Sequence, residues 1–177
     1  MTLTLRRARP TDAAALAEQL AEPEVFPGLL QMPYANVELW QQRLNTPPTA
    51  GSPDLMLVAE LGGKVVGSAG LHPVSAQLRR RHAMMLGISV SAASQGQGVG
   101  NALMAALLDY ADNWAQVLRI ELTVFHDNQR AIRLYERHGF APEGRCKAYA
   151  LRHGAYEDVL LMARLHPRQP LVPQGSD

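Results

Sequence analysis

The chain has very little of what would tie it to an oxidising compartment, a membrane or a polyanion. Cys146 is its single cysteine, so no internal disulfide can form and the chain suits a reducing cytosol. No apolar run approaches the roughly 18 residues of a membrane span, and the segment before Pro10 is too polar for a signal peptide. The formal net charge of +1 creates no large field for nucleic acid or an anionic membrane. We therefore expect a cytoplasmic domain whose partners include neither nucleic acid nor membrane.

What the chain does have is enough apolar sequence for one core. Of its 177 residues, 47% are hydrophobic, which is ordinary for a globular protein. This length suits a single domain. From His166 onward the sequence is rich in proline and has no apolar periodicity. We expect one domain over residues 1–165 and a disordered tail over 166–177.

Apolar periodicity predicts strands and helices in a mixed order. Apolar residues at helical spacing, with capping residues, predict helices at 13–20, 37–45, 98–114 and 128–138. Alternating or β-branched runs predict strands at 2–9, 55–61, 64–71, 82–90, 119–125, 145–151 and 156–165. Gly62-Gly63 and His153-Gly154 predict hairpin turns. This order is neither doubly wound nor a barrel and indicates an α+β class.

Three alternating glycines stand where the strand at 82–90 gives way to a helix. Gly96, Gly98 and Gly100 lack the Cβ atoms that would keep a ligand away from the backbone. The free N–H groups of the first helical turn suit a phosphate or pyrophosphate. A P-loop is excluded because no Lys follows these glycines, and a dinucleotide fingerprint would need a glycine where Asn101 stands. A surface turn before a glycine-rich helix stays open as the alternative.

Three separated blocks of the chain carry motifs that occur together in one family. The first block reads Gln95-Gly96-Gln97-Gly98-Val99-Gly100, the second runs N-Q-R-A-I-R-L-Y-E-R-H-G-F from Asn128 to Phe140, and the third is Arg6-x-x-Arg9-Pro10-x-Asp12. They resemble the pyrophosphate loop Q/R-x-x-G-x-G/A, the motif N-x-x-A-x-x-L-Y-x-x-x-G-F and the opening of the GNAT acyltransferases. The resemblance covers residues 3 to about 165. Residues 119–125 and 149–156 are most similar to the bacterial L-amino-acid N-acetyltransferase subgroup.

The resemblance implies a GNAT fold, with a mixed, mostly antiparallel sheet whose strands 82–90 and 119–125 splay apart between flanking helices. It implies acetyl-CoA as the co-substrate and requires no metal. The pantetheine arm would lie along the first of these strands and the pyrophosphate on the glycine turn. The implied cofactor-binding residues are Ile88, Ser89, Val90, Gln95, Gly96, Gln97, Gly98, Val99, Gly100, Asn101, Asn128 and Tyr135.

Acetyl transfer to an amine requires a neutral amine, a stabilised oxyanion and a proton for the departing thiolate. The resemblance implies that Tyr135 supplies the proton and that a backbone N–H near Val90 meets the oxyanion. Glu121 interrupts an apolar strand, so it is either a catalytic base in a cleft or half of a buried ion pair. Weaker candidates for the base are His126, His72 and His82. Direct transfer is preferred because a lone thiol such as Cys146 is usually inert.

Large apolar side chains crowd the segment 25–34 and the closing hairpin. A solvated loop rarely carries so many, so we expect them to build the acceptor pocket. Such a pocket suits a compact apolar or aromatic amine, for example free phenylalanine or methionine, better than a polyamine. The predicted substrate-binding residues are Phe26, Leu29, Met32, Tyr34, Tyr149 and Tyr156, with Trp40 beside them.

Other functions remain compatible with the sequence. One is acetylation of a peptide or protein N-terminus, or of an amine drug. Another is a non-catalytic acyl-CoA-binding module, which would not need Tyr135. A nucleotide-binding domain is a more distant alternative. The edges of the closing hairpin could pair across a homodimer.

Overall fold

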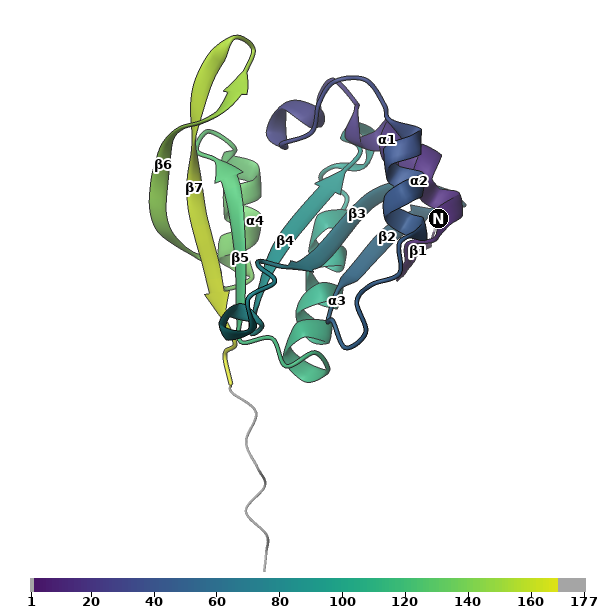
Figure 1. The fold of residues 1–177 in the computed structure, drawn as a ribbon. Helices are drawn as coiled ribbons and strands as arrows, with labels where there is room; N and C mark the ends of the chain where they lie inside the picture. The colour runs from purple at the N-terminus through teal and green to yellow at the C-terminus, as the bar shows by residue number, and fades with distance from the viewer. Residues whose placement is uncertain (1, 169–177) are drawn as a thin grey trace, which may run out of the picture.

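The computed structural model describes residues 2–168. Its elements follow the predicted order (Figure 1). The helices are α1 (Ala13–Leu20), α2 (Val37–Asn45), α3 (Val99–Asn113) and α4 (Gln129–Arg137). The strands are β1 (Leu3–Arg7), β2 (Leu55–Leu61), β3 (Lys64–Pro73), β4 (Ala83–Val90), β5 (Arg119–Phe125), β6 (Ala141–Arg152) and β7 (Ala155–Leu165).

One seven-stranded sheet contains all of these strands, in the order β1-β2-β3-β4-β5-β7-β6. Every neighbouring pair is antiparallel except β4 and β5, which are parallel. The β4–β5 pairing covers only Ala83–Met85 against Arg119–Glu121. Beyond Met85 the two strands are no longer paired, so the splay expected from the sequence is confirmed.

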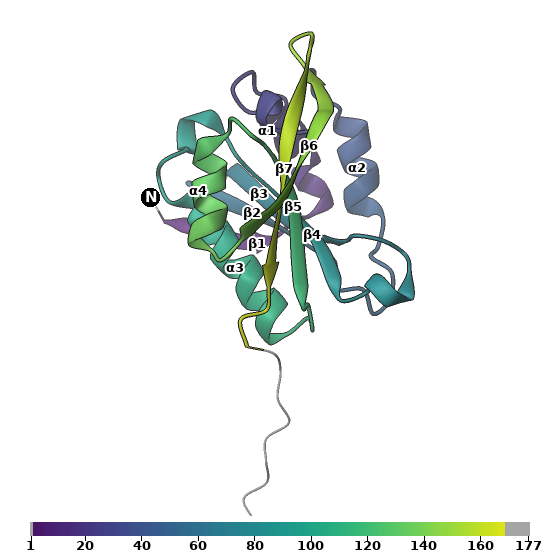
Figure 2. The ribbon, with the colours of Figure 1, turned by 90° about the vertical axis from the view of Figure 1, so that its left-hand side faces the viewer.

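Helices cover both faces of the sheet (Figure 2). On one face α3 and α4 bury the larger core, in which Leu103, Met104 and Leu107 have no exposed surface. On the other face α1 and α2 pack on β2, where Val58 is fully buried between the helices. Full burial of one such aliphatic side chain stabilises the fold by about 1.5–3 kcal/mol.

Most boundaries of the elements agree with the prediction to within two residues, and two differences bear on the hairpin and the tail. β6 begins at Ala141, four residues before the predicted strand. His166, which the sequence assigns to the tail, is held to the domain: its backbone N–H donates to Leu118 O at 2.8 Å and its Nε2 lies 3.0 Å from Asp112 O. The folded part therefore extends at least one residue further. The predicted tail from residue 169 lies outside the described residues. No helix within residues 2–168 is long and apolar enough to cross a membrane.

Candidate functional site

The glycine turn after β4 presents unpaired backbone donors. Gly96 and Gly98 have φ values of +80° and +84°, which only glycine adopts without strain. Gly98 is the N-cap of α3. The N–H groups of residues 96–101 have no hydrogen-bond partner among residues 2–168. A helix start with free N–H groups and the positive end of its dipole can hold a phosphate.

Side chains around the turn hold it in place. Gln95 donates from Nε2 to Val90 O at 3.0 Å and accepts at Oε1 from Arg130 at 2.6 Å. A Cβ at Gly96 would lie 3.4 Å from Arg130 Nη2. The turn is thereby fixed to β4 on one side and to α4 on the other. Gln97 and Val99 turn away: Gln97 bonds to Ala93 O at 2.9 Å, and Val99 is buried in the core, so only their backbone faces a ligand.

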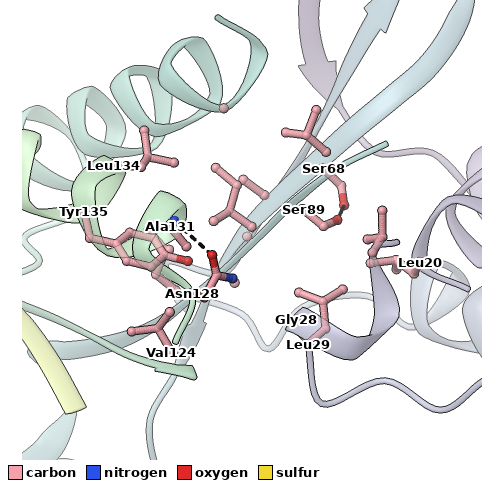
Figure 3. Close-up of a pocket in the computed structure, with 18 of the residues that line it drawn as sticks. Leu20, Gly28, Leu29, Ser68, Ser89, Val124, Asn128, Ala131, Leu134 and Tyr135 are labelled. Atoms are coloured by element: carbon pink, nitrogen blue, oxygen red, sulfur yellow. Dashed lines mark hydrogen bonds between the residues drawn. The ribbon is translucent and has the colours of Figure 1, made fainter. Parts of the chain in front are cut away.

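A cavity of about 850 Å³ follows the splay between β4 and β5. This volume is typical of a site for a small molecule or cofactor. One wall comes from β5 and α4, and the other from β3, β4, the end of α1 and the loop after it (Figure 3). Of the predicted cofactor-binding residues, those with side chains or backbone in the lining are Ile88, Ser89, Val90, Gln95, Gly96, Gly98, Gly100, Asn101, Asn128 and Tyr135.

Tyr135 and Asn128 lie together on the α4 wall. Asn128 caps α4 by accepting from Ala131 N at 3.1 Å, and the ring of Tyr135 points towards it (Figure 3). Tyr135 is 7% exposed, and Phe140 packs against it with ring centroids 5.9 Å apart. Burial raises the pKa of Tyr135 to about 12. The phenol therefore keeps its proton throughout the neutral range.

The opposite wall carries a buried polar chain that the sequence did not reveal. Ser89 on β4 donates to Gln19 Oε1 on α1 at 3.2 Å, and its hydroxyl lies 3.4 Å from that of Ser68 on β3. All three residues are less than 9% exposed. Across the cavity, a Cβ at Gly28 would lie 3.4 Å from Asn128 Nδ2. The segment Phe26–Gly28 therefore approaches the start of α4 and narrows the cavity.

Glu121 lies outside the cavity lining. Its Oε1 accepts from Arg80 Nη2 at 2.6 Å and from Arg119 Nε at 2.7 Å, and Arg119 also binds Glu143. Burial alone would raise the pKa of Glu121, but the hydrogen bonds from Arg119 and Arg80 outweigh it and leave the pKa below its usual value. Of the two alternatives left open by the sequence, the geometry favours the ion pair over the base.

The predicted acceptor pocket is only partly assembled. Leu29, Trp40 and Tyr149 line the cavity, together with Met56 and Met85. Phe26 is half-buried outside the lining. Met32, Tyr34 and Tyr156 are exposed by 78%, 90% and 71%, so they do not enclose this cavity. Met32 and Tyr34 lie in the loop between α1 and α2, after the segment Phe26–Gly28, and Tyr156 lies near the tip of the hairpin.

Charged residues of the lining are mostly cationic. The lining contains three arginines, Arg43, Arg130 and Arg137, one carboxylate, Glu24, and the imidazole of His72. Arg43 stacks on Trp40, with its guanidinium carbon 5.1 Å from the ring centroid. No carboxylate lies within ion-pair distance of Arg43 among residues 2–168. Sequence reasoning did not identify Arg43 as a site residue. The one available indication was its position three residues after Trp40, since residues at that spacing share a helix face.

Comparison with known proteins decides the family. The model of the acetyltransferase (GNAT) family matches residues 16–140. The chain belongs to the GNAT family. The L-amino acid N-acetyltransferase AaaT of Escherichia coli (strain K12) is 40% identical over 163 residues, which cover 92% of this chain and 98% of the relative. This GNAT protein is thus an acetyl-CoA-dependent N-acetyltransferase, as its sequence predicted.

Solved structures agree on the fold of this acetyltransferase. Ribosomal-protein-alanine N-acetyltransferase from Brucella melitensis has a TM-score of 0.82 at 26% identity, covering 92% of this chain and 99% of that one. The yncA structure from Salmonella typhimurium, solved with its cofactor acetyl-CoA, has a TM-score of 0.80 at 21% identity, covering 98% and 99%. The second likeness concerns the fold alone. The expected α+β GNAT fold is confirmed.

Proposed function

We propose that this GNAT enzyme transfers the acetyl group of acetyl-CoA directly to the amine of a free apolar or aromatic L-amino acid. The observation that carries the proposal is the charge of the cavity. Its three guanidinium groups and one carboxylate suit the phosphates of CoA and an acceptor with a carboxylate of its own. A polyamine, which would require several carboxylates, would find one in the lining, Glu24. The relationship to AaaT, named for L-amino acids, supports the same acceptor class.

In this proposal the cofactor and the acceptor occupy different ends of the cavity. The pyrophosphate binds the free N–H groups of residues 96–101, and the pantetheine arm follows the unpaired edge of β4 from Ile88 to Val90. The acceptor lies among Leu29, Trp40 and Tyr149, and Arg43 binds its carboxylate. Cys146 lies on β6 and does not line the cavity, which supports direct transfer without an acyl-enzyme.

The first test is release of CoASH from acetyl-CoA over a panel of the twenty amino acids, polyamines, peptides and aminoglycosides. We expect turnover with apolar or aromatic amino acids. The sharpest comparison is phenylalanine against phenethylamine, which lacks only the carboxylate. Activity confined to peptides would overturn the free amino acid and favour a protein N-terminus, the acceptor class named for the Brucella melitensis structural neighbour.

Arg43→Gln tests the carboxylate site. Hydrogen bonds to a charged group contribute about 1.5–3 kcal/mol, so the KM for the amino acid should rise about tenfold to a hundredfold. The KM for the decarboxylated amine should stay nearly constant. Arg133→Gln is the matched control, because Arg133 is an exposed arginine of α4 outside the lining. An equal effect of Arg43→Gln on both acceptors would contradict the assignment.

We propose Tyr135 as the acid that protonates the departing thiolate. Its raised pKa keeps the phenol protonated, and its burial at the cavity wall keeps bulk water away from it. Tyr135→Phe should lower kcat by about 10²–10⁴-fold, the range of a lost general acid. The Kd for acetyl-CoA, measured by calorimetry, should change by no more than about threefold. A kcat within threefold of wild type would exclude this role.

A further inference from the structure

His72 is the histidine among the residues that line the cavity. It lies near the end of β3 and contributes to the lining. Its Nδ1 lies 3.1 Å and 3.2 Å from the two carboxylate oxygens of Asp54. The ring also reaches back along the strand, because its Nε2 lies only 2.7 Å from where a Cβ at Gly70 would be. The imidazole is therefore held by a carboxylate at one nitrogen, and its other nitrogen lies over Gly70.

The contact with Asp54 selects one tautomer of the neutral imidazole. A carboxylate accepts hydrogen bonds, so the neutral imidazole carries its proton on Nδ1. Nε2 then has a free lone pair. No hydrogen bond to Nε2 is made by any residue among 2–168. This is the orientation that a carboxylate gives to a catalytic histidine base.

The space over the strands beside Nε2 is open because the two residues paired there are both glycines. Gly70 on β3 pairs with Gly87 on β4, and such paired residues lie about 4.5–5.5 Å apart. A Cβ at Gly87 would have no atom within 4 Å. Gly87 directly precedes Ile88, at the start of the β4 segment proposed for the pantetheine arm. An amine placed over Gly87 would therefore lie between Nε2 and the thioester.

Other titratable groups are less suitable as the base. Glu121 is outside the lining and held by two arginines. His126 is also outside the lining, with Nδ1 3.3 Å from Asp158 O. Around His72, Asp54 is the charged neighbour at hydrogen-bond distance, and Met85, its partner on β4, is apolar. Glu24, Arg43 and Tyr149 are the further titratable groups of the acceptor end.

We propose that His72, oriented by Asp54, is the general base that takes the proton from the acceptor ammonium. The inference rests on the proposed amine acceptor but not on its being an amino acid. Nε2 accepts one proton from the ammonium, and the neutral amine attacks the thioester carbonyl. When the C–S bond breaks, the thiolate receives a proton from Tyr135, which regains one from the new amide nitrogen. The imidazolium finally releases its proton to water, so the reaction yields the amide, CoASH and one proton.

The test is the pH dependence of kcat for His72→Gln, using whichever amine of the panel is turned over fastest. The variant should lose about 10²-fold in kcat at pH 7, where a base is needed to deprotonate the ammonium. Its rate should recover as the pH rises towards the ionisation of the ammonium itself. The KM for acetyl-CoA should stay within threefold. A side-chain-fluorinated acceptor with a lower amine pKa should restore much of the loss.

Three further variants separate catalysis from structure. His153→Gln is the matched control, since His153 is exposed at the tip of the β6–β7 hairpin and does not line the cavity. Asp54→Asn should lower kcat without a comparable rise in KM, because Asp54 acts only by positioning the ring. Gly70→Ala forces the imidazole away from a contact of 2.7 Å while meeting backbone only at 3.3 Å, so it should also lower kcat. Far-UV circular dichroism checks that each variant is folded.

A kcat for His72→Gln within threefold of wild type, or an unchanged pH profile, would overturn the assignment of His72. Its failure is distinct from failure of the proposed acceptor. If the panel shows an amine other than an amino acid, the proposed acceptor fails while the pH test of His72 still runs with that amine. If amino acids are acetylated and the pH profile does not move, the acceptor stands and His72 is not the base.

Discussion

Asp12 is a buried carboxylate matched by donors on several sides. Arg6 donates to it from Nη1 at 2.8 Å and from Nη2 at 2.9 Å, and the backbone N–H of Arg9 donates at 2.7 Å. The hydrogen bonds from Arg6 are the main cause of its lowered pKa. Arg6 also binds Glu60 on β2. This cluster connects the start of α1 to the sheet edge, which explains why the block Arg6-x-x-Arg9-Pro10-x-Asp12 has these residues at this spacing.

Asp12→Asn should lower the free energy of unfolding at pH 7 by about 3 kcal/mol, since it leaves a guanidinium without its partner. The folded-state pKa of Asp12 lies below the unfolded value of about 3.9. Its contribution is therefore complete above that value and is lost as the pH falls through the folded-state pKa. Urea unfolding at pH 7 and pH 3 should show a smaller acid loss in the variant. Glu18→Gln, on the exposed side of α1, is the control; parallel acid losses in wild type and Asp12→Asn would refute the pairing.

For single residues, the sequence identified members of the site better than it identified their hydrogen-bond partners. Tyr135 and Asn128 followed from a motif, and the structure brings them together at the cavity. For Glu121, Arg119 two positions earlier lies on the same face of the strand and was a visible partner. The other partner of Glu121, Arg80, could not be recognised in the sequence, because it is 41 residues away and only the folded chain brings it to β5. His72 was only a weaker candidate for the base for the same reason: its contact with Asp54, 18 residues earlier, forms only in the folded chain.

At the level of elements, the closing hairpin departs most from its sequence pattern. Its pairing shifts between Cys146 and Ala150, and Ala148 has a φ of +50°. Asp158 on β7 holds this bulge by accepting from Ala148 N at 2.9 Å and from Arg145 Nε at 2.7 Å. A bulge changes which side chains face each side of a strand. Tyr149, within this bulge, lines the cavity, whereas Tyr156, next to the hairpin tip, does not.

The elements that were predicted well have strong local signals. The Gly62-Gly63 turn, the cap at Asn128 and the glycine turn before α3 each appear where the sequence placed them. Such signals act within a few residues and do not depend on the rest of the fold. The acceptor end is different, because its lining comes from the loop after α1, from α2, from β3 and from the hairpin. No local pattern could select Leu29 over Met32 in that loop.

For the whole molecule, the two parts of the sheet are joined at one end and separate at the other. The join contains the short β4–β5 pairing. Beside it, Arg164 on β7 donates to Asp112 on α3 at 2.8 Å and 2.6 Å, and the side chain of His166 bonds to the backbone of the same residue. We expect these contacts to help hold the angle at which β5 leaves β4. The cytoplasmic location and the homodimer remain predictions.

Asp112→Asn should therefore weaken both the fold and cofactor binding. Arg164 and Asp112 have side chains only 10% and 17% exposed, so breaking the pair should cost about 3 kcal/mol of unfolding free energy. Because the splay is then less fixed, the Kd for acetyl-CoA should rise about tenfold, which equals 1.4 kcal/mol. Calorimetry gives the Kd, and hydrogen exchange along β4 and β5 should increase in the variant. Asp109→Asn is the control, since Asp109 is exposed one turn earlier on α3 and, within residues 2–168, its side chain bonds only to Asn113. A destabilised Asp112→Asn that binds acetyl-CoA as tightly as wild type would mean that the β4–β5 pairing alone sets the splay.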